Sequence, residues 1–360
     1  MRPFTYETPA ARIVFGPGCA ERVLAEEVER LGARRVLVVT TPRHTSLAAS
    51  LPVVATFDGV RPHVPEETVD DAVAVATWAD ADAVVCVGGG SATGTAKAIA
   101  LRTALPIVAV PTTYAGSEVT PVWGTTDGAR KITGRSPLVV PKTVLYDPAL
   151  TLTLPATTTA ASAMNAMAHC VEAFYAPGAN PITDLVAAEG VRVIADALPG
   201  VMADPAGVTG RTGLLYGAYL AGSAFAAAGS GLHHKICHVL GGAFGLPHAE
   251  THTVLLPHVA AFNEPAVPAL RTRVAPALGD VNVTDGLTRL AARIGAPKSL
   301  AQIGLAKDDL DMAIKLVLEK DLSDNPRDVG EPEVRRILTG ALRGRLPAAT
   351  APSPTRGEPR

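Results

Sequence analysis

The sequence is poor in aromatic residues and has little excess charge of either sign. Aromatic side chains make up 4% of its 360 residues and charged ones 18%, and the formal net charge is -2 at pH 7. Nucleic-acid-binding proteins are usually basic, so this balance argues against such a partner. The hydrophobic fraction of 48% is that of a globular chain. At this length it predicts two domains.

Cysteine is also scarce and widely spaced. The four cysteines, Cys19, Cys86, Cys170 and Cys237, form no CxxC pair. This spacing argues against a disulfide framework or a zinc ribbon and favours reduced thiols. The first residues show no basic segment followed by an apolar one, so we expect no signal peptide and a cytoplasmic location.

One uncharged stretch has the length of a membrane span. Residues 213–232 contain no charged side chain, and about 20 apolar residues suffice to cross a bilayer. The stretch is mainly Ala, Gly and Ser and only weakly hydrophobic. We therefore predict a buried helix and no membrane association.

Short apolar runs alternate with helical patterns in the first half of the chain. Residues 35–40, 83–87 and 106–110 are typical of strands, and residues 20–31 and 68–79 of helices. Such alternation predicts a parallel sheet with helices on both faces. We predict an α/β, Rossmann-like dinucleotide-binding domain over residues 1–155.

The pattern changes in the second half. Helical stretches rich in Ala, Leu and Val continue to about residue 343, without a convincing strand after residue 158. We predict an all-α domain over residues 156–345. The Pro-rich residues 346–360 lack periodicity and are predicted to form a disordered tail.

A glycine-rich loop follows the strand predicted at residues 83–87. It reads Gly88-Gly89-Gly90-Ser91 and leads directly into a helical pattern. Glycines allow close approach of a ligand to the backbone, and a helix N-terminus attracts an anion such as a pyrophosphate. The loop lacks the GxGxxG pattern, so by itself it fits a tight turn without a ligand equally well.

A second polar loop, residues 111–118, follows the strand predicted at residues 106–110. Ligands of parallel sheets bind at the carboxyl ends of the strands, although an N-capped turn is the alternative. With a threonine after the strand at residues 35–40, the cofactor-binding candidates are Thr41, Gly88, Gly89, Gly90, Ser91, Thr93, Thr112, Thr113 and Ser117.

Several of the nine histidines gather in otherwise apolar segments. Asn165 and His169 share a helical face, as do His234 and His238, and His248 follows ten residues later. A lone histidine in a helix is usually a packed core residue. A group of histidines instead suits proton transfer or metal binding at neutral pH, although the spacing matches no HExxH site.

Together these segments resemble the iron-containing alcohol dehydrogenases, over nearly the whole chain. The family's cofactor loop, GGGSxxDxxK, is matched by residues 88–97 except that Gly94 replaces the aspartate. The resemblance implies an NAD(P)-binding domain followed by a helical metal-binding domain, on a scaffold related to dehydroquinate synthase. It places the family's metal ligands on Asn165, His169, His234 and His248, and a histidine near the nicotinamide on His238.

At the positions where this sequence departs from the family pattern, it resembles one branch of that family, the maleylacetate reductases. This likeness is carried by Gly94, Asn165 and three strings: residues 111–131 (PTTYAGSEVTPVWGTTDGARK), 231–238 (GLHHKICH) and 247–252 (PHAETH). It implies reduction of the 2-ene bond of maleylacetate, or of 2-substituted maleylacetates, to 3-oxoadipate during the degradation of aromatic compounds. The implied partners are NADH or NADPH, a small dicarboxylate and a second copy of the chain in a homodimer.

The implied reaction needs a group that stabilises an enolate and one that protonates the adjacent carbon. We predict five catalytic residues, His169, His234, His238, His248 and Lys235, with His238 as the leading proton donor. The candidates for binding the substrate carboxylates are Lys235, Lys131, Arg130, His63 and Thr113, although basic residues more often lie on the surface without such a role.

Two departures affect the cofactors. The neutral amide of Asn165 is a poor substitute for a carboxylate ligand, so we expect no metal and interpret the four positions as a vestigial site. No acidic residue follows the strand at residues 35–40, and Arg43 is positioned to receive a 2′-phosphate. This predicts that both NADH and NADPH are accepted.

Several alternatives stay open at the level of sequence. One is a metal-dependent alcohol dehydrogenase or aldehyde reductase of the same family, and another is an enone-acid reductase of a biosynthetic pathway. A non-redox enzyme on the dehydroquinate-synthase-like scaffold is disfavoured by the string at residues 111–121. A non-catalytic nucleotide-binding module would have no need of a histidine-rich pocket.

Overall fold

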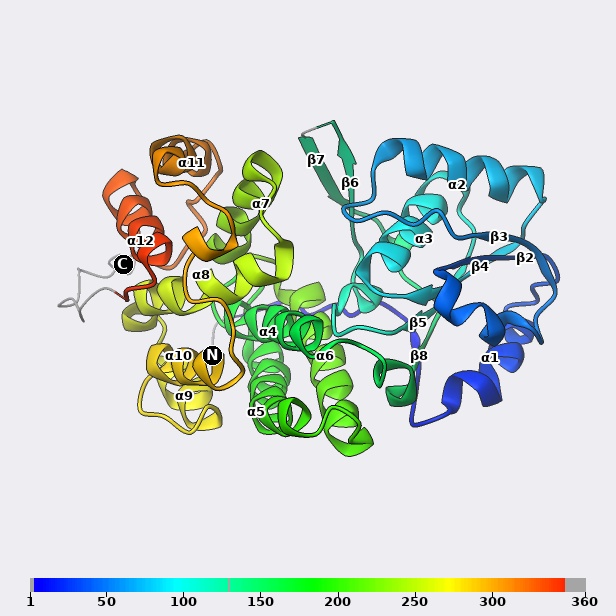
Figure 1. Cartoon of the computed structure of the whole chain (residues 1–360), viewed down its shortest axis with the longest axis horizontal. Helices are drawn as coiled ribbons and strands as arrows, with labels where there is room; N and C mark the ends of the chain where they lie inside the picture. The colour runs from blue at the N-terminus through cyan, green and yellow to red at the C-terminus, as the bar shows by residue number, and fades with distance from the viewer. Residues whose placement is uncertain (1–2, 129, 347–360) are drawn as a thin grey trace.

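Six parallel strands form the core of the first half of the chain (Figure 1). The computed structural model describes residues 3–128 and 130–346. The sheet has the order β1-β8-β5-β4-β2-β3, and every pair of neighbours is parallel. Its strands are β1 (Arg12–Phe15), β2 (Val36–Thr40), β3 (Val53–Phe57), β4 (Ala83–Gly88), β5 (Ile107–Pro111) and β8 (Thr143–Tyr146).

The central strands are buried on both faces, as their unbroken apolar sequences predict. Every residue of β2, β4 and β5 is buried. On one face the strands pack against α1 (Cys19–Arg30), and on the other against α2 (Glu66–Trp78) and α3 (Gly90–Thr103). The predicted α/β architecture is therefore confirmed.

An antiparallel hairpin stands apart from this sheet. Strands β6 (Val122–Asp127) and β7 (Arg130–Arg135) pair with each other and project from the α/β domain toward α7 of the second half (Figure 1). Sequence analysis did not identify the hairpin. Its residues are mostly polar and only partly buried, so they lack the apolar pattern by which strands are recognised.

The second half is helical, as predicted, and no described residue after residue 158 lies in a strand. Residues 213–232 fall mainly in α6, which packs against α4 and α5. None of the described helices is long and apolar enough to cross a membrane. The helices are α4 (Ala156–Ala173), α5 (Pro181–Ala203), α6 (Val208–Ala228), α7 (Leu232–Phe244), α8 (His248–Asn263), α9 (Ala275–Ala277), α10 (Val283–Arg293), α11 (Leu310–Leu318) and α12 (Glu331–Arg343).

Short helical turns connect these elements. They are the 3-10 helices η1 (Pro42–Ala48), η2 (Ser117–Val119), η3 (Pro137–Val139), η4 (Pro148–Thr151), η5 (Glu264–Ala266), η7 (Ala301–Ile303) and η8 (Lys307–Asp309), and the π-helix η6 (Leu270–Val274). Of the tail predicted at residues 346–360, residues 347–360 lie outside the described part of the chain.

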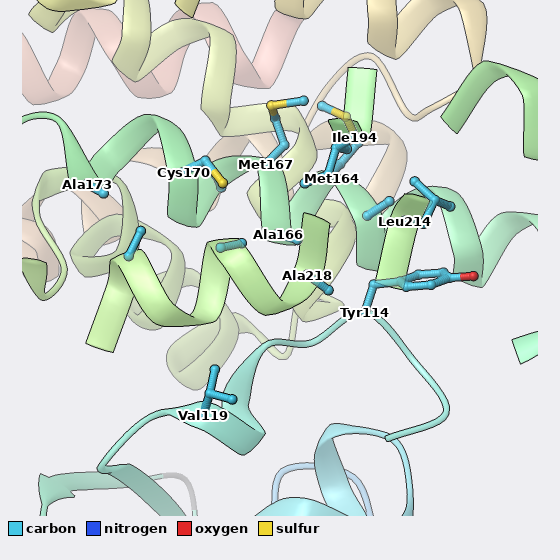
Figure 2. Close-up of a cluster of buried hydrophobic side chains, with 14 of the residues drawn as sticks. Tyr114, Val119, Met164, Ala166, Met167, Cys170, Ala173, Ile194, Leu214 and Ala218 are labelled. Carbon is cyan, nitrogen blue, oxygen red and sulfur yellow. The ribbon is translucent and has the colours of Figure 1, made fainter. Parts of the chain in front are cut away.

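The two halves meet where the loop after β5 packs on α4 and α6. Tyr114 and Val119 of that loop belong to the same buried cluster as Met164 of α4 and Ala218 of α6 (Figure 2). Arg211 of α6, which is fully buried, also donates a hydrogen bond to the Tyr114 hydroxyl at 3.2 Å. The loop is thus part of the α/β domain by sequence and part of the helical core by packing.

Two glycines allow this loop to touch α6 with its backbone. A Cβ added to Gly222 would lie 2.3 Å from the carbonyl oxygen of Gly116, a separation that real Cβ atoms essentially never show. Gly116 itself has a φ of +73°, in the left-handed region that favours glycine. A side chain at either position would force the loop away from the helix.

Candidate functional site

A cavity of about 490 Å³ lies between the two halves of the chain. Its volume is typical of small-molecule sites. Its walls come from the turn before α2, the loops after β4 and β5, the β6–β7 hairpin and helices α3, α4, α6, α7 and α8. Among the residues predicted for the site it brings together Gly90, Ser91, Thr113, Ser117, Asn165, His169, His234, His238 and His248.

The two predicted cofactor loops lie side by side at the carboxyl edge of the sheet. The Thr112 N–H donates to the Gly88 carbonyl at 2.9 Å. A Cβ on Gly89 would lie 2.8 Å from Cγ2 of Thr113, so the loops approach closely only because this residue is glycine. Gly90 and Ser91, which open α3, line the cavity. The free N–H groups and dipole of a helix N-terminus suit a pyrophosphate.

Five of the predicted cofactor residues do not line this cavity: Thr41, Gly88, Gly89, Thr93 and Thr112. Gly88, Gly89 and Thr112 instead shape the two loops, and Thr93 is buried in the first turn of α3. Thr41 directly follows β2. The side chain of Arg43, predicted to receive a 2′-phosphate, lies outside the described part of the structure.

Sequence reasoning missed Lys97, a buried cation in the cavity wall. Its Nζ donates to the carbonyl oxygens of Ser117, Thr120 and Val122, at 2.6, 2.8 and 2.8 Å, and to Oγ1 of Thr120 at 3.1 Å. Burial lowers the pKa of Lys97 to about 7. Lys97 holds the loop after β5 in place. The sequence feature that could have identified Lys97 was its match to the lysine of the family's cofactor loop.

Gly94, where the family loop has an aspartate, faces a strained turn. A Cβ on Gly94 would lie 2.7 Å from Cγ2 of Val64. His63 and Val64 have φ angles of 63° and 53°, which are rare for residues with a side chain and above all for a β-branched one. The space that an aspartate side chain would need is filled by this turn.

Six histidines of α4, α7 and α8 form one cluster at the helical side of the cavity: His169, His233, His234, His238, His248 and His252. His252 was not among the predicted site residues. Its ring centroid lies 4.6 Å from that of His234 and 4.4 Å from that of His248. One helical turn separates it from His248, and that spacing was the signal available in the sequence.

A buried carboxylate, also missed, is hydrogen-bonded to this cluster. One oxygen of Glu172 bonds Nδ1 of His234, and the other accepts the His234 backbone N–H at 3.3 Å. Burial raises the pKa of Glu172, but His234 and the other hydrogen bonds outweigh burial, so the net pKa lies below its ordinary value. An ionised Glu172 fixes the His234 ring and leaves Nε2 as the atom available to a ligand.

The structure does not bring Lys235 to the cavity, which corrects its predicted role. Its ammonium donates to Oδ1 of Asp324 at 2.6 Å and to the carbonyl of Asp321 at 2.7 Å. Consecutive residues of an α-helix point about 100° apart, so α7 cannot turn Lys235 to the same side as His234. Among the other carboxylate candidates, His63, Lys131 and Thr113 line the cavity and Arg130 does not.

Comparison with known proteins covers both halves of the chain. The model of the iron-containing alcohol dehydrogenases matches residues 10–148, and that of the C-terminal part of the same family matches residues 159–342. The chain belongs to the iron-containing alcohol dehydrogenase family.

Within this family, the most similar proteins include maleylacetate reductases. That of Sphingobium indicum is 46% identical over 97% of this chain and 99% of its own length. The crystal structure of maleylacetate reductase from Agrobacterium tumefaciens superposes with a TM-score of 0.92 at 44% identity, covering 96% of this chain and all of that one. The branch predicted from the sequence motifs is confirmed.

Membership of the iron-containing alcohol dehydrogenases makes the chain an NAD(P)H-dependent oxidoreductase, as predicted. A more distant relative, sulfoacetaldehyde reductase from Bifidobacterium kashiwanohense, has been solved in complex with NAD+; it matches with a TM-score of 0.86 at 25% identity over 95% of this chain and 99% of its own. The paired loops and the N-terminus of α3 are the features of this chain that suit such a cofactor.

The buried histidines predict a loss of stability in acid. Burial lowers the pKa of His233 to about 4, of His248 to about 3 and of His258 to about 4, whereas an unfolded histidine titrates near 6.5. Below about pH 6.5 the unfolded chain therefore binds protons that the folded chain does not. The free energy of unfolding should fall from there toward pH 4, by at most about 1.4 kcal/mol per pH unit for each such histidine.

Urea unfolding at pH 7 and pH 5 measures this effect. His258 does not line the cavity, and His258→Leu should give a shallower dependence on pH whatever its stability at pH 7. Equal unfolding free energies at the two pH values in the unsubstituted protein would contradict the prediction.

Proposed function

We propose that the protein reduces the 2-ene double bond of maleylacetate, and of 2-substituted maleylacetates, to give 3-oxoadipate. The observation that carries this proposal is its near full-length similarity to maleylacetate reductases. The cavity supports it, because one space joins a loop suited to a dinucleotide with a cluster of proton-carrying side chains.

The reduced nicotinamide supplies a hydride when bound. The acceptor is C2 of the substrate, because the C2=C3 bond is conjugated to the ketone at C4. The electron pair of that bond moves toward the ketone oxygen and forms an enolate. A proton delivered to C3 restores the ketone and completes the reduction. The protein must therefore stabilise negative charge on one oxygen and protonate one carbon.

Two histidines of the cavity are suited to these tasks. His234 has a carboxylate partner, Glu172, that offsets positive charge on its ring. His238 lies one turn further along α7 and also lines the cavity. We propose His234 as the group that stabilises the enolate and keep His238 as the proton donor. His169 and His248 complete the polar wall.

Purified protein should oxidise both NADH and NADPH with maleylacetate and form 3-oxoadipate. Loss of absorbance of the reduced cofactor measures the rate, and a panel of simple aldehydes is the control. Good turnover of an aldehyde without turnover of maleylacetate would contradict the proposed substrate. A preference for NADH beyond about a hundredfold, roughly 2.7 kcal/mol, would contradict dual cofactor use.

We also propose that the enzyme is a cytoplasmic homodimer. Support for a dimer comes from β1, an edge strand of the sheet, because the unpaired backbone groups of such an edge favour pairing with another chain. The preparation used for the assay should sediment as a dimer, and a monomer at the same concentration would exclude this arrangement.

Replacing His238 by alanine tests its role as proton donor. Loss of a general acid typically lowers turnover by about a hundredfold or more. His238→Ala should do so while NADH binding, followed by fluorescence titration, stays close to that of the unsubstituted protein. His258→Ala, in a histidine outside the cavity, is the matched control. If His238→Ala keeps turnover within a few-fold of that of the unsubstituted protein, another residue is the proton donor. A large loss of turnover in Glu172→Gln would then favour His234 as that donor.

We further propose that the reaction needs no metal ion, although the family is named for iron. Asn165 Oδ1, His169 Nδ1 and His234 Nε2 are buried without a hydrogen-bond partner in the described structure, so these atoms are open to a ligand. The chemistry of the ligand set argues against a tightly held divalent ion, because Asn165 contributes no negative charge and an amide oxygen is a weaker ligand than a carboxylate. A conjugated enone also needs less activation than an alcohol does.

Dialysis against EDTA tests this proposal. Activity should survive, and elemental analysis should find far less than one iron or zinc per chain. Stoichiometric metal, with activity lost on chelation and restored by the ion, would contradict it. Asn165→Asp restores the family's carboxylate and should raise metal affinity without raising reductase activity.

A further inference from the structure

The cavity wall contains a cation that the proposed hydride and proton transfers do not use. Lys131 of β7 lines the cavity, and burial lowers the pKa of its ammonium. The described part of the chain provides this ammonium with no hydrogen-bond or ion-pair partner, whereas Lys97 in the same wall donates to four oxygen atoms. A partly buried charge without a counter-ion is unfavourable.

The side chains around Lys131 do not supply that counter-ion. The nearby histidines His63, His238 and His248 each have a pKa lowered by burial and also by the positive charge of Lys131. Glu250 also lines the cavity but forms no ion pair with Lys131. The region therefore has a positive potential that favours an anionic ligand.

The backbone holds this region in a strained form. His63 and Val64 both have positive φ values, and the hairpin fixes them: Thr126 donates its N–H to the Val64 carbonyl at 3.0 Å and its hydroxyl to the His63 carbonyl at 2.8 Å. Such strain persists only where the surroundings enforce it, and it is concentrated at functional sites. A second space of about 190 Å³ is lined by His63, Lys131, His238 and His248 and leaves room beside the ammonium.

We propose that Lys131, with His63 beside it, binds one carboxylate of the substrate and makes the enzyme select dianionic enones over neutral carbonyl compounds. The inference rests on the proposed function for the identity of the substrate. A lysine ammonium acts as a compact point charge. A carboxylate beside it supplies the missing counter-ion, while a neutral substrate leaves the ammonium unpaired. The β6–β7 hairpin is thus the element that sets specificity.

A binding experiment tests this inference without turnover. The probes are adipate, an unreactive six-carbon dicarboxylate, and adipamide, its neutral diamide of the same length. Calorimetric titration of the NADH-bound protein should show that adipate binds about tenfold more tightly than adipamide, a difference of about 1.4 kcal/mol. Lys131→Met should bind the two alike. Lys131→Arg should keep much of the preference, and Lys235→Met, which removes a lysine outside the cavity, should keep all of it.

Two results would overturn the inference: an undiminished preference in Lys131→Met, or no preference in the unsubstituted protein. An unchanged NADH affinity and melting temperature in Lys131→Met show that the variant is folded. With maleylacetate, Lys131→Met should raise KM about tenfold or more and change kcat by only a few-fold. If the unsubstituted protein fails to reduce maleylacetate, the proposed function is wrong, yet the adipate titration still decides whether Lys131 binds a carboxylate.

Discussion

The loop between β5 and β6 is held from two sides, and the cavity depends on this. On the α/β side, Lys97 donates to two of its carbonyl groups and to that of Val122, the first residue of β6. On the helical side, Gly116 touches the backbone of α6 at Gly222, and the Tyr114 N–H donates to Oγ of Ser162 at 3.0 Å. The loop therefore fixes where the cofactor-binding edge of the sheet lies relative to the histidines of α4, α7 and α8. A cavity between two domains keeps its geometry only if such a connection is rigid.

The electrostatics of the helical wall follow from burial. Burial lowers the pKa of five of the six clustered histidines, His169, His233, His238, His248 and His252, and their closeness to one another lowers it further. The remaining member, His234, has the carboxylate of Glu172 at its ring. The carboxylate of Glu172 therefore distinguishes His234 from the other five histidines, although the six look alike in the sequence.

The departures from the family pattern have structural counterparts. Gly94 replaces an aspartate where the strained turn at Val64 fills the space, and the same turn, hydrogen-bonded to the hairpin, presents His63 to the cavity. Asn165 replaces a charged ligand on a helix that already carries a buried carboxylate, Glu172, about two helical turns further along α4.

The sequence by itself determined the elements whose signals are local. The unbroken apolar runs at β2, β4 and β5, the glycine loop before α3 and the helical pattern after residue 158 depend on backbone geometry and burial, which a short segment encodes. Only the tertiary structure decided which side chains act together. It paired Glu172 with His234, brought Lys97 to a loop twenty residues away and turned Lys235 to a surface ion pair. It left Lys131 in the cavity without a hydrogen-bond or ion-pair partner among the described residues. The partner of a charged group is chosen by distances across the fold, and no local pattern records those distances.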